Sequence, residues 1–150
     1  MDRKKLDGHP GFGPGPDLDI EKIADFFEAD DNPHATRDKA LILMFLGTGG
    51  RLVEVLDLIW DDVQGDFVCF KQRKRFSRQI PMPSFLRLAL AELYQAEGTP
   101  PLSEPVFRRR GRAMTSSQIQ AVFHRVRAAT GSPLSARLAR RFVMHMIAKL

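Results

Sequence analysis

The sequence is poor in cysteine and contains no long apolar run. Cys69 is the only cysteine among 150 residues, which excludes an intrachain disulfide and a zinc site built from several cysteines. No apolar run approaches the length needed to cross a bilayer, and the N-terminus, Met-Asp-Arg-Lys-Lys, lacks the apolar segment of a secretory signal. We therefore expect a cytoplasmic protein with no membrane partner.

Acidic residues are missing from the C-terminal part of the chain after Glu104. Residues 105–150 contain ten basic residues and no aspartate or glutamate. Residues 1–66 contain 7 Lys and Arg against 15 Asp and Glu, a net charge of −8, whereas residues 67–150 contain 16 against 3, a net charge of +13. This separation favours a surface for a polyanion, with nucleic acid as the first candidate, over a basic face that is merely solvated.

The pattern of apolar and turn-forming residues predicts one domain that is mainly α-helical. A Gly/Pro-rich segment, residues 1–16, is expected to be a flexible linker, and residues 17–150 to form the domain. Alternation predicts a β-hairpin with strands at 67–72 and 78–82, and a short strand at 106–107. The fold class is therefore α+β, mainly α with a small antiparallel hairpin. Helices are expected from Asp17 or Asp19, over 36–46, 52–58 and 84–96, after Thr115 or Ser116, and after Ser135.

An arginine at a corner between two apolar helices is the most informative feature. Gly47, Gly49 and Gly50 end one helix, Arg51 follows directly, and Glu54 lies one turn into the next helix. A guanidinium anchored at such a corner can meet an anion with its planar fork. The alternative is that Arg51 pairs locally with Glu54 or Asp57 at helical spacing.

Four segments in order resemble motifs of the tyrosine recombinases, the phage integrase family. The first is Thr48-Gly49-Gly50-Arg51 with Glu54, and the second is the hairpin that ends in Ile80-Pro81-Met82. The third joins Val106-Phe107 through a loop to a Thr/Ser-capped helix, and the fourth is Ser135-Ala136-Arg137-Leu138-Ala139-Arg140. The resemblance covers about residues 17–150. It implies a catalytic domain that breaks and rejoins double-stranded DNA without a metal or other cofactor, in association with the nucleoid.

The resemblance also implies roles for individual residues. Arg51 and Arg140 would clamp the scissile phosphate, and a hairpin lysine, Lys74 or alternatively Lys71, would protonate the leaving 5′ oxygen. Arg137 stands where the family usually has histidine; it can donate to a phosphate oxygen, but it cannot act as a neutral base near pH 7. Basic side chains expected to contact DNA phosphates are Lys71, Arg73, Arg75, Arg108, Arg109, Arg110 and Arg112.

The sequence departs from a complete family member at the nucleophile. Its only tyrosine, Tyr94, precedes the last motif and lies on the helix predicted at 84–96, where we expect it to pack in the core. We therefore expect a truncated catalytic domain that binds DNA but does not cut it alone, whether as an isolated part, a shortened gene product or a decayed relative.

Two alternative functions belong to different classes. The first is a non-catalytic DNA-binding module that occupies recombination sites or pairs with an intact recombinase. In either case the partner is double-stranded DNA, with a homo-oligomer on DNA or an association with an intact recombinase. The second is a basic helical protein that binds RNA or an acidic partner.

Overall fold

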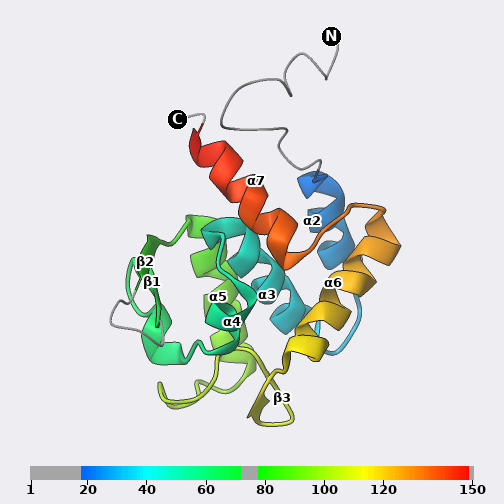
Figure 1. Cartoon of the computed structure of the whole chain (residues 1–150). Coiled ribbons are helices and arrows are strands. Elements are labelled where there is room, and N and C mark those ends of the chain that lie inside the picture. Colours follow the sequence, from blue (N-terminus) through cyan, green and yellow to red (C-terminus); the bar gives the residue numbers. More distant parts are fainter. Residues whose placement is uncertain (1–17, 72–77, 149–150) are drawn as a thin grey trace.

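The structure is a computed structural model that describes residues 18–71 and 78–148. The predicted linker at 1–16 and the hairpin residues Arg73, Lys74 and Arg75 lie outside the described residues. Figure 1 shows a mainly helical molecule with a small hairpin at one side, which confirms the predicted fold class. Within the described ranges, no helix is both long and apolar enough to span a bilayer.

Three helices begin at side-chain caps that the sequence predicted. Helix α2 (Ile20–Ala29) is capped by Asp19, whose carboxylate accepts the N–H of Lys22 at 3.1 Å. Thr115 caps α6 (Ser116–Thr130) in a reciprocal capping box with Gln118. Ser135 Oγ accepts the N–H of Leu138 in the first turn of α7 (Ala136–Ala148).

Helix α3 (Ala35–Thr48) forms the centre of the core. It packs against α5 (Ser84–Ala96) and α7, while α2 packs against α6 (Figure 1). The apolar residues of α3 include Leu41, Met44 and Phe45, all with no exposed surface. Because α3 is covered on several sides, its apolar positions do not follow one stripe, and its C-terminal end is held rigidly.

The corner between α3 and α4 (Leu52–Leu56) leaves no room for side chains. Gly49 ends α3 in the left-handed conformation, with φ of 68°. A Cβ on Gly50 would lie 2.8 Å from Cζ of Phe70 and 3.1 Å from a methyl carbon of Val55. The glycines therefore let the chain turn against the hairpin and place Arg51 at the surface.

The strands are shorter than predicted. β1 (Phe67–Phe70) and β2 (Arg78–Pro81) pair antiparallel, with Phe70 opposite Arg78. The strand predicted at 106–107 was wrong: a second small hairpin lies two residues later, formed by β3 (Arg108–Arg109) and β4 (Arg112–Ala113). Val106 instead donates its N–H to the carbonyl of Leu58, beside the single-turn 3-10 helix η1 (Trp60–Val63), which the sequence pattern did not predict.

Candidate functional site

Three predicted site arginines line one cavity of about 500 Å³. Arg51 comes from the α3–α4 corner, and Arg137 and Arg140 come from the first turns of α7. Phe123 and Arg127 of α6 form another part of the lining. Residues 51 and 140 are far apart in the sequence, so the fold brings together guanidinium groups that the sequence could place only in separate motifs.

The guanidinium of Arg51 is not paired with the carboxylates of its own helix. Arg51 is exposed, and within the described residues its guanidinium forms no ion pair with a carboxylate. The Glu54 carboxylate instead accepts the backbone N–H of Arg51 at 2.8 Å and pairs with Arg78. The local pairing considered as an alternative for Arg51 is therefore absent, and its fork is available to an anion.

Arg140 ties α7 to the glycine corner. Its Nη1 donates to the carbonyl oxygen of Gly49 at 2.8 Å. Val143, one turn later, lies close to the same corner, because a Cβ on Gly49 would be 3.3 Å from Cβ of Val143. Burial, followed by the positive charges of Arg51 and Arg78, lowers the pKa of Arg140 from its ordinary value, whereas Glu54 opposes this shift. The cluster therefore concentrates positive charge that an anion would relieve.

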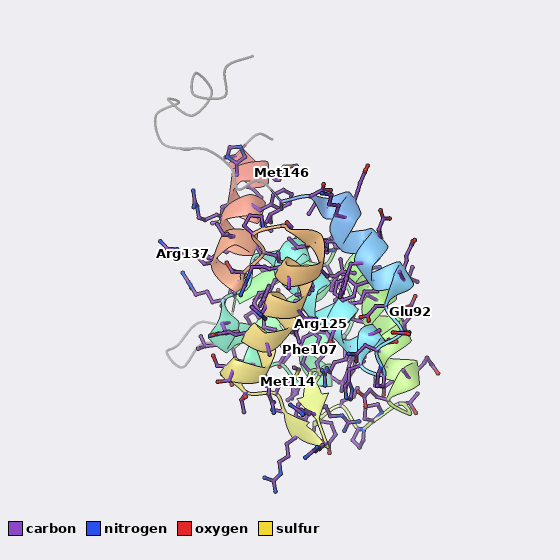
Figure 2. The ribbon with its side chains drawn as sticks, turned by 90° about the vertical axis from the view of Figure 1, so that its right-hand side faces the viewer. Glu92, Phe107, Met114, Arg125, Arg137 and Met146 are labelled. Carbon is purple, nitrogen blue, oxygen red and sulfur yellow. The ribbon has the colours of Figure 1, made fainter. Side chains whose placement is uncertain are left out.

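Arg137 is exposed at the start of α7, as Figure 2 shows. The loop before this helix is fixed by Arg127, whose Nη1 donates to the carbonyl of the buried Leu134 at 2.8 Å. This bond anchors the start of α7 to α6, and so sets the position from which Arg137 and Arg140 reach the cavity. The backbone N–H groups of a helix start also favour an anion there.

The two candidate lysines fall in different parts of the hairpin. Lys71 follows β1, and its ammonium lies 3.3 Å from Oδ1 of Asp62, a carboxylate that is only 7% exposed. That ion pair occupies Lys71 in this structure. Lys74 lies outside the described residues, so the choice between the two lysines stays a prediction.

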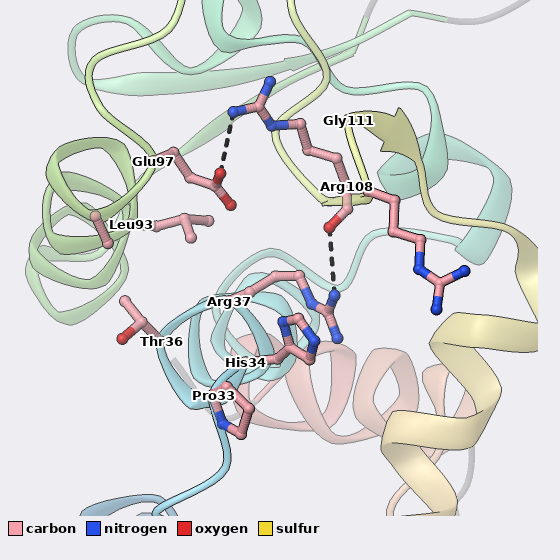
Figure 3. A pocket seen from close by; sticks show the side chains of 10 residues that line it. Pro33, His34, Thr36, Arg37, Leu93, Glu97, Arg108 and Gly111 are labelled. Atoms are coloured by element: carbon pink, nitrogen blue, oxygen red, sulfur yellow. Dashed lines mark hydrogen bonds and ion pairs between the residues drawn. The ribbon is translucent and has the colours of Figure 1, made fainter.

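The arginines at 108–112 do not form one uniform surface patch. The Arg108 guanidinium pairs with Glu97 at 3.0 Å, and its carbonyl accepts from the buried Arg37 (Figure 3). Glu104 lies 3.7 Å from the same guanidinium. The neighbouring Arg109, Arg110 and Arg112 are exposed. The structure therefore assigns Arg108 a role in holding the loop, and leaves the other three facing solvent.

Sequence reasoning missed Arg78. Its Nη2 lies 2.6 Å from Oε1 of Glu54, and its guanidinium lies over the ring of Phe70, 5.3 Å from the centroid. A signal for this position exists in the sequence, because alternation places Arg78 on the same face of its strand as the half-buried Ile80. A partly buried arginine needs an acidic or hydrogen-bonding partner. The alternation of the strand predicts that Arg78 has such a partner, but it does not identify Glu54.

Tyr94 is held as a packing residue. Its ring meets Trp60 edge-on at 4.9 Å between centroids, and its hydroxyl donates to the carbonyl of Pro100 at 2.9 Å. We expect no covalent DNA adduct from this chain, because releasing Tyr94 would break both contacts. A nicked suicide duplex, which traps adducts as a denaturant-resistant band, checks this expectation, and Tyr94→Phe should leave DNA affinity unchanged. A trapped adduct that Tyr94→Phe abolishes would instead make Tyr94 the nucleophile.

Comparison with known proteins decides the family. The sequence model described as the phage integrase family matches residues 17–149. This chain belongs to the phage integrase family. No match was found among curated proteins. Because the match extends through all four predicted motifs, the resemblance inferred from the residues is confirmed.

Solved structures share the fold of this integrase-family chain at low sequence identity. The XerA recombinase is 19% identical with a TM-score of 0.72, over 91% of this chain and 52% of that one. The XerH site-specific recombinase bound to its difH substrate is 21% identical with a TM-score of 0.70, over 87% of this chain and 41% of that one. The lambda integrase catalytic core is 17% identical with a TM-score of 0.64, over 88% and 86%. The chain thus spans about half of the XerA structure but most of the lambda catalytic core.

Proposed function

We propose that this chain is the DNA-binding catalytic domain, or part of it, of a site-specific tyrosine recombinase. Its cavity would hold one phosphate of double-stranded DNA between Arg51 and Arg140. The observation that carries the proposal is that Arg51, Arg137 and Arg140 line one cavity although they come from two distant motifs. Family membership and the DNA-bound XerH structure of the same fold support it.

The chemistry of the cavity suits a phosphodiester that gains charge during strand cleavage. Arginine forks donate paired hydrogen bonds to phosphate oxygens, and preorganised donors stabilise charge that develops in a transition state. Arg137 would add a donor but no proton transfer, since arginine stays protonated. Lys74, or alternatively Lys71, would supply the proton to the leaving oxygen. Copies of the chain, or this chain and an intact recombinase, would assemble on the DNA.

Salt dependence of duplex binding tests the proposal. We expect log affinity to fall steeply with log salt between about 50 and 200 mM, because each neutralised phosphate releases counterions. Replacing Arg109, Arg110 and Arg112 together with glutamine should reduce the slope by about 0.9 for each phosphate that is no longer neutralised, with little change in sequence preference. Fluorescence anisotropy of a labelled duplex gives both quantities.

Arg87→Gln provides the matched control for these substitutions. Arg87 lies on α5, and its ion pair with Asp66 involves two largely exposed side chains. Removing its charge should leave the affinity and the slope nearly unchanged. An affinity that is flat over the same salt range, or equal for single-stranded RNA and duplex DNA, would refute the proposal.

A further inference from the structure

Arg78 and Glu54 form an ion pair beside Arg51, one of the arginines that line the cavity. Arg78 starts β2, and its side chain is 26% exposed, whereas that of Glu54 is 5% exposed. Their shortest distance is 2.6 Å, from Nη2 to Oε1. A carboxylate buried to this degree needs a compensating positive charge, because desolvation of an unpaired charge is costly.

One oxygen of Glu54 serves two groups at once. Oε1 accepts from Arg78 and also from the backbone N–H of Arg51, at 2.8 Å. Helix α4 is only five residues long, so this cap at its first turn fixes where the backbone of Arg51 lies. Glu54 is therefore needed for position, but its negative charge would oppose an anion in the cavity.

One further polar atom of each partner is buried without a hydrogen bond. Within the described residues, Glu54 Oε2 and Arg78 Nε are both in this state. A hydrogen bond between these two atoms would complete a bidentate contact. As it stands, a single hydrogen bond joins the pair. The guanidinium also stacks over Phe70, the ring that Gly50 approaches at the corner. Arg78 thus contacts both Glu54 of α4 and Phe70 of β1, two residues at the Arg51 corner.

We propose that Arg78 is a positioning residue for the phosphate site: it neutralises Glu54, so that Glu54 can hold Arg51 without repelling the phosphate. This inference rests on the proposed function of the Arg51–Arg140 cavity. The fields of both partners reach that cavity, since Arg78 and Glu54 shift the pKa of Arg140 in opposite directions. Lysine would fill the role less well, because only a planar guanidinium can stack on Phe70 while its edge meets a carboxylate.

A charge cycle tests the inference, using affinity for a short duplex at low salt. Every variant is measured at a temperature where circular dichroism shows it to be folded, so that a merely structural role would change the melting temperature but not this affinity. We expect Arg78→Gln to weaken binding by about tenfold to 100-fold, and Arg78→Lys by less. Glu54→Gln combined with Arg78→Gln should return to within about threefold of Glu54→Gln alone, because no buried charge remains. Arg87→Gln, which breaks an exposed ion pair, should change affinity by less than about twofold.

Three outcomes would overturn the inference, and one separates it from the proposed function. If Arg78→Gln binds like Arg87→Gln while Arg51→Ala is weakened, Arg78 has no positioning role and the cavity assignment stands. If the double variant remains as weak as Arg78→Gln, Arg78 acts on the phosphate directly. If Arg78→Gln alone does not fold, the double variant is compared with Glu54→Gln alone. A duplex affinity of the double variant that is clearly lower than that of Glu54→Gln contradicts the inference. If Arg51→Ala also has no effect, the proposed function itself fails.

Discussion

Replacing Asp38 with alanine is expected to lower the free energy of unfolding by about 3–5 kcal/mol. The Asp38 side chain is 3% exposed, and its two oxygens bind different arginines. Oδ1 lies 2.9 Å from the buried Arg37, and Oδ2 lies 2.7 Å from Arg125 of α6, which also pairs with Asp30. Removing the carboxylate leaves buried positive charge without its partner, which costs more than the loss of one ion pair.

The raised pKa of Arg125 also indicates that the carboxylates of Asp30 and Asp38 stabilise its positive charge. Burial lowers this pKa, but hydrogen bonds from Arg125 to Asp30 and Asp38 outweigh burial, so the pKa is raised from its ordinary value. The network joins the α2–α3 connection and α3 to α6, which forms one wall of the arginine cavity. We therefore expect Asp38→Ala to loosen the support of the cavity as well as the core.

Urea denaturation measures the effect, and Glu92→Ala is the control. Glu92 meets Lys39 at 3.8 Å between side chains that are 51% and 40% exposed, so its removal should cost less than about 1 kcal/mol. Equal losses for Asp38→Ala and Glu92→Ala would show that the Asp38 network does not support the fold.

Replacing Arg140 with alanine is expected to weaken duplex binding by about tenfold to 100-fold, as for loss of a charge-assisted hydrogen bond of about 1.5–3 kcal/mol. The substitution also removes the bond from Nη1 to the carbonyl of Gly49, which links α7 to the corner. Arg140→Lys should recover part of the affinity, since it keeps the charge but lacks the fork. Anisotropy titration checks both variants, and an Arg140→Ala affinity equal to that of Arg87→Ala would place the phosphate elsewhere.

The sequence predicted those features that depend on neighbouring residues. Asp19, Thr115 and Ser135 cap their helices as expected because a cap depends on residues two or three positions away. Gly49 and Gly50 predicted the corner for the same reason, whereas Gly47, also expected to end the helix, lies inside α3. The family's motifs then indicated that Arg51 and Arg140 meet, which no local pattern could provide.

Features that depend on distant partners could not be predicted in this way. Arg108 looked equivalent to the arginines beside it, but the fold brings Glu97 and Glu104 to its guanidinium. The role of Arg78 required the pairing of β2 with β1 and the position of Glu54, 24 residues earlier. The partner of Lys71, Asp62, lies on a 3-10 turn that has no strong sequence signature.

The central claim is that Arg51 and Arg140 share one DNA phosphate, and a double-mutant cycle on duplex affinity tests it most directly. Arg51→Ala, Arg140→Ala and the double variant are compared with the unmodified chain at one salt concentration. Two guanidiniums on one phosphate should give a coupling energy of about 1 kcal/mol or more, so the double variant should lose less affinity than the sum of the single losses. Losses that add to within about 0.5 kcal/mol would mean that the two arginines bind separate phosphates, and would contradict the account.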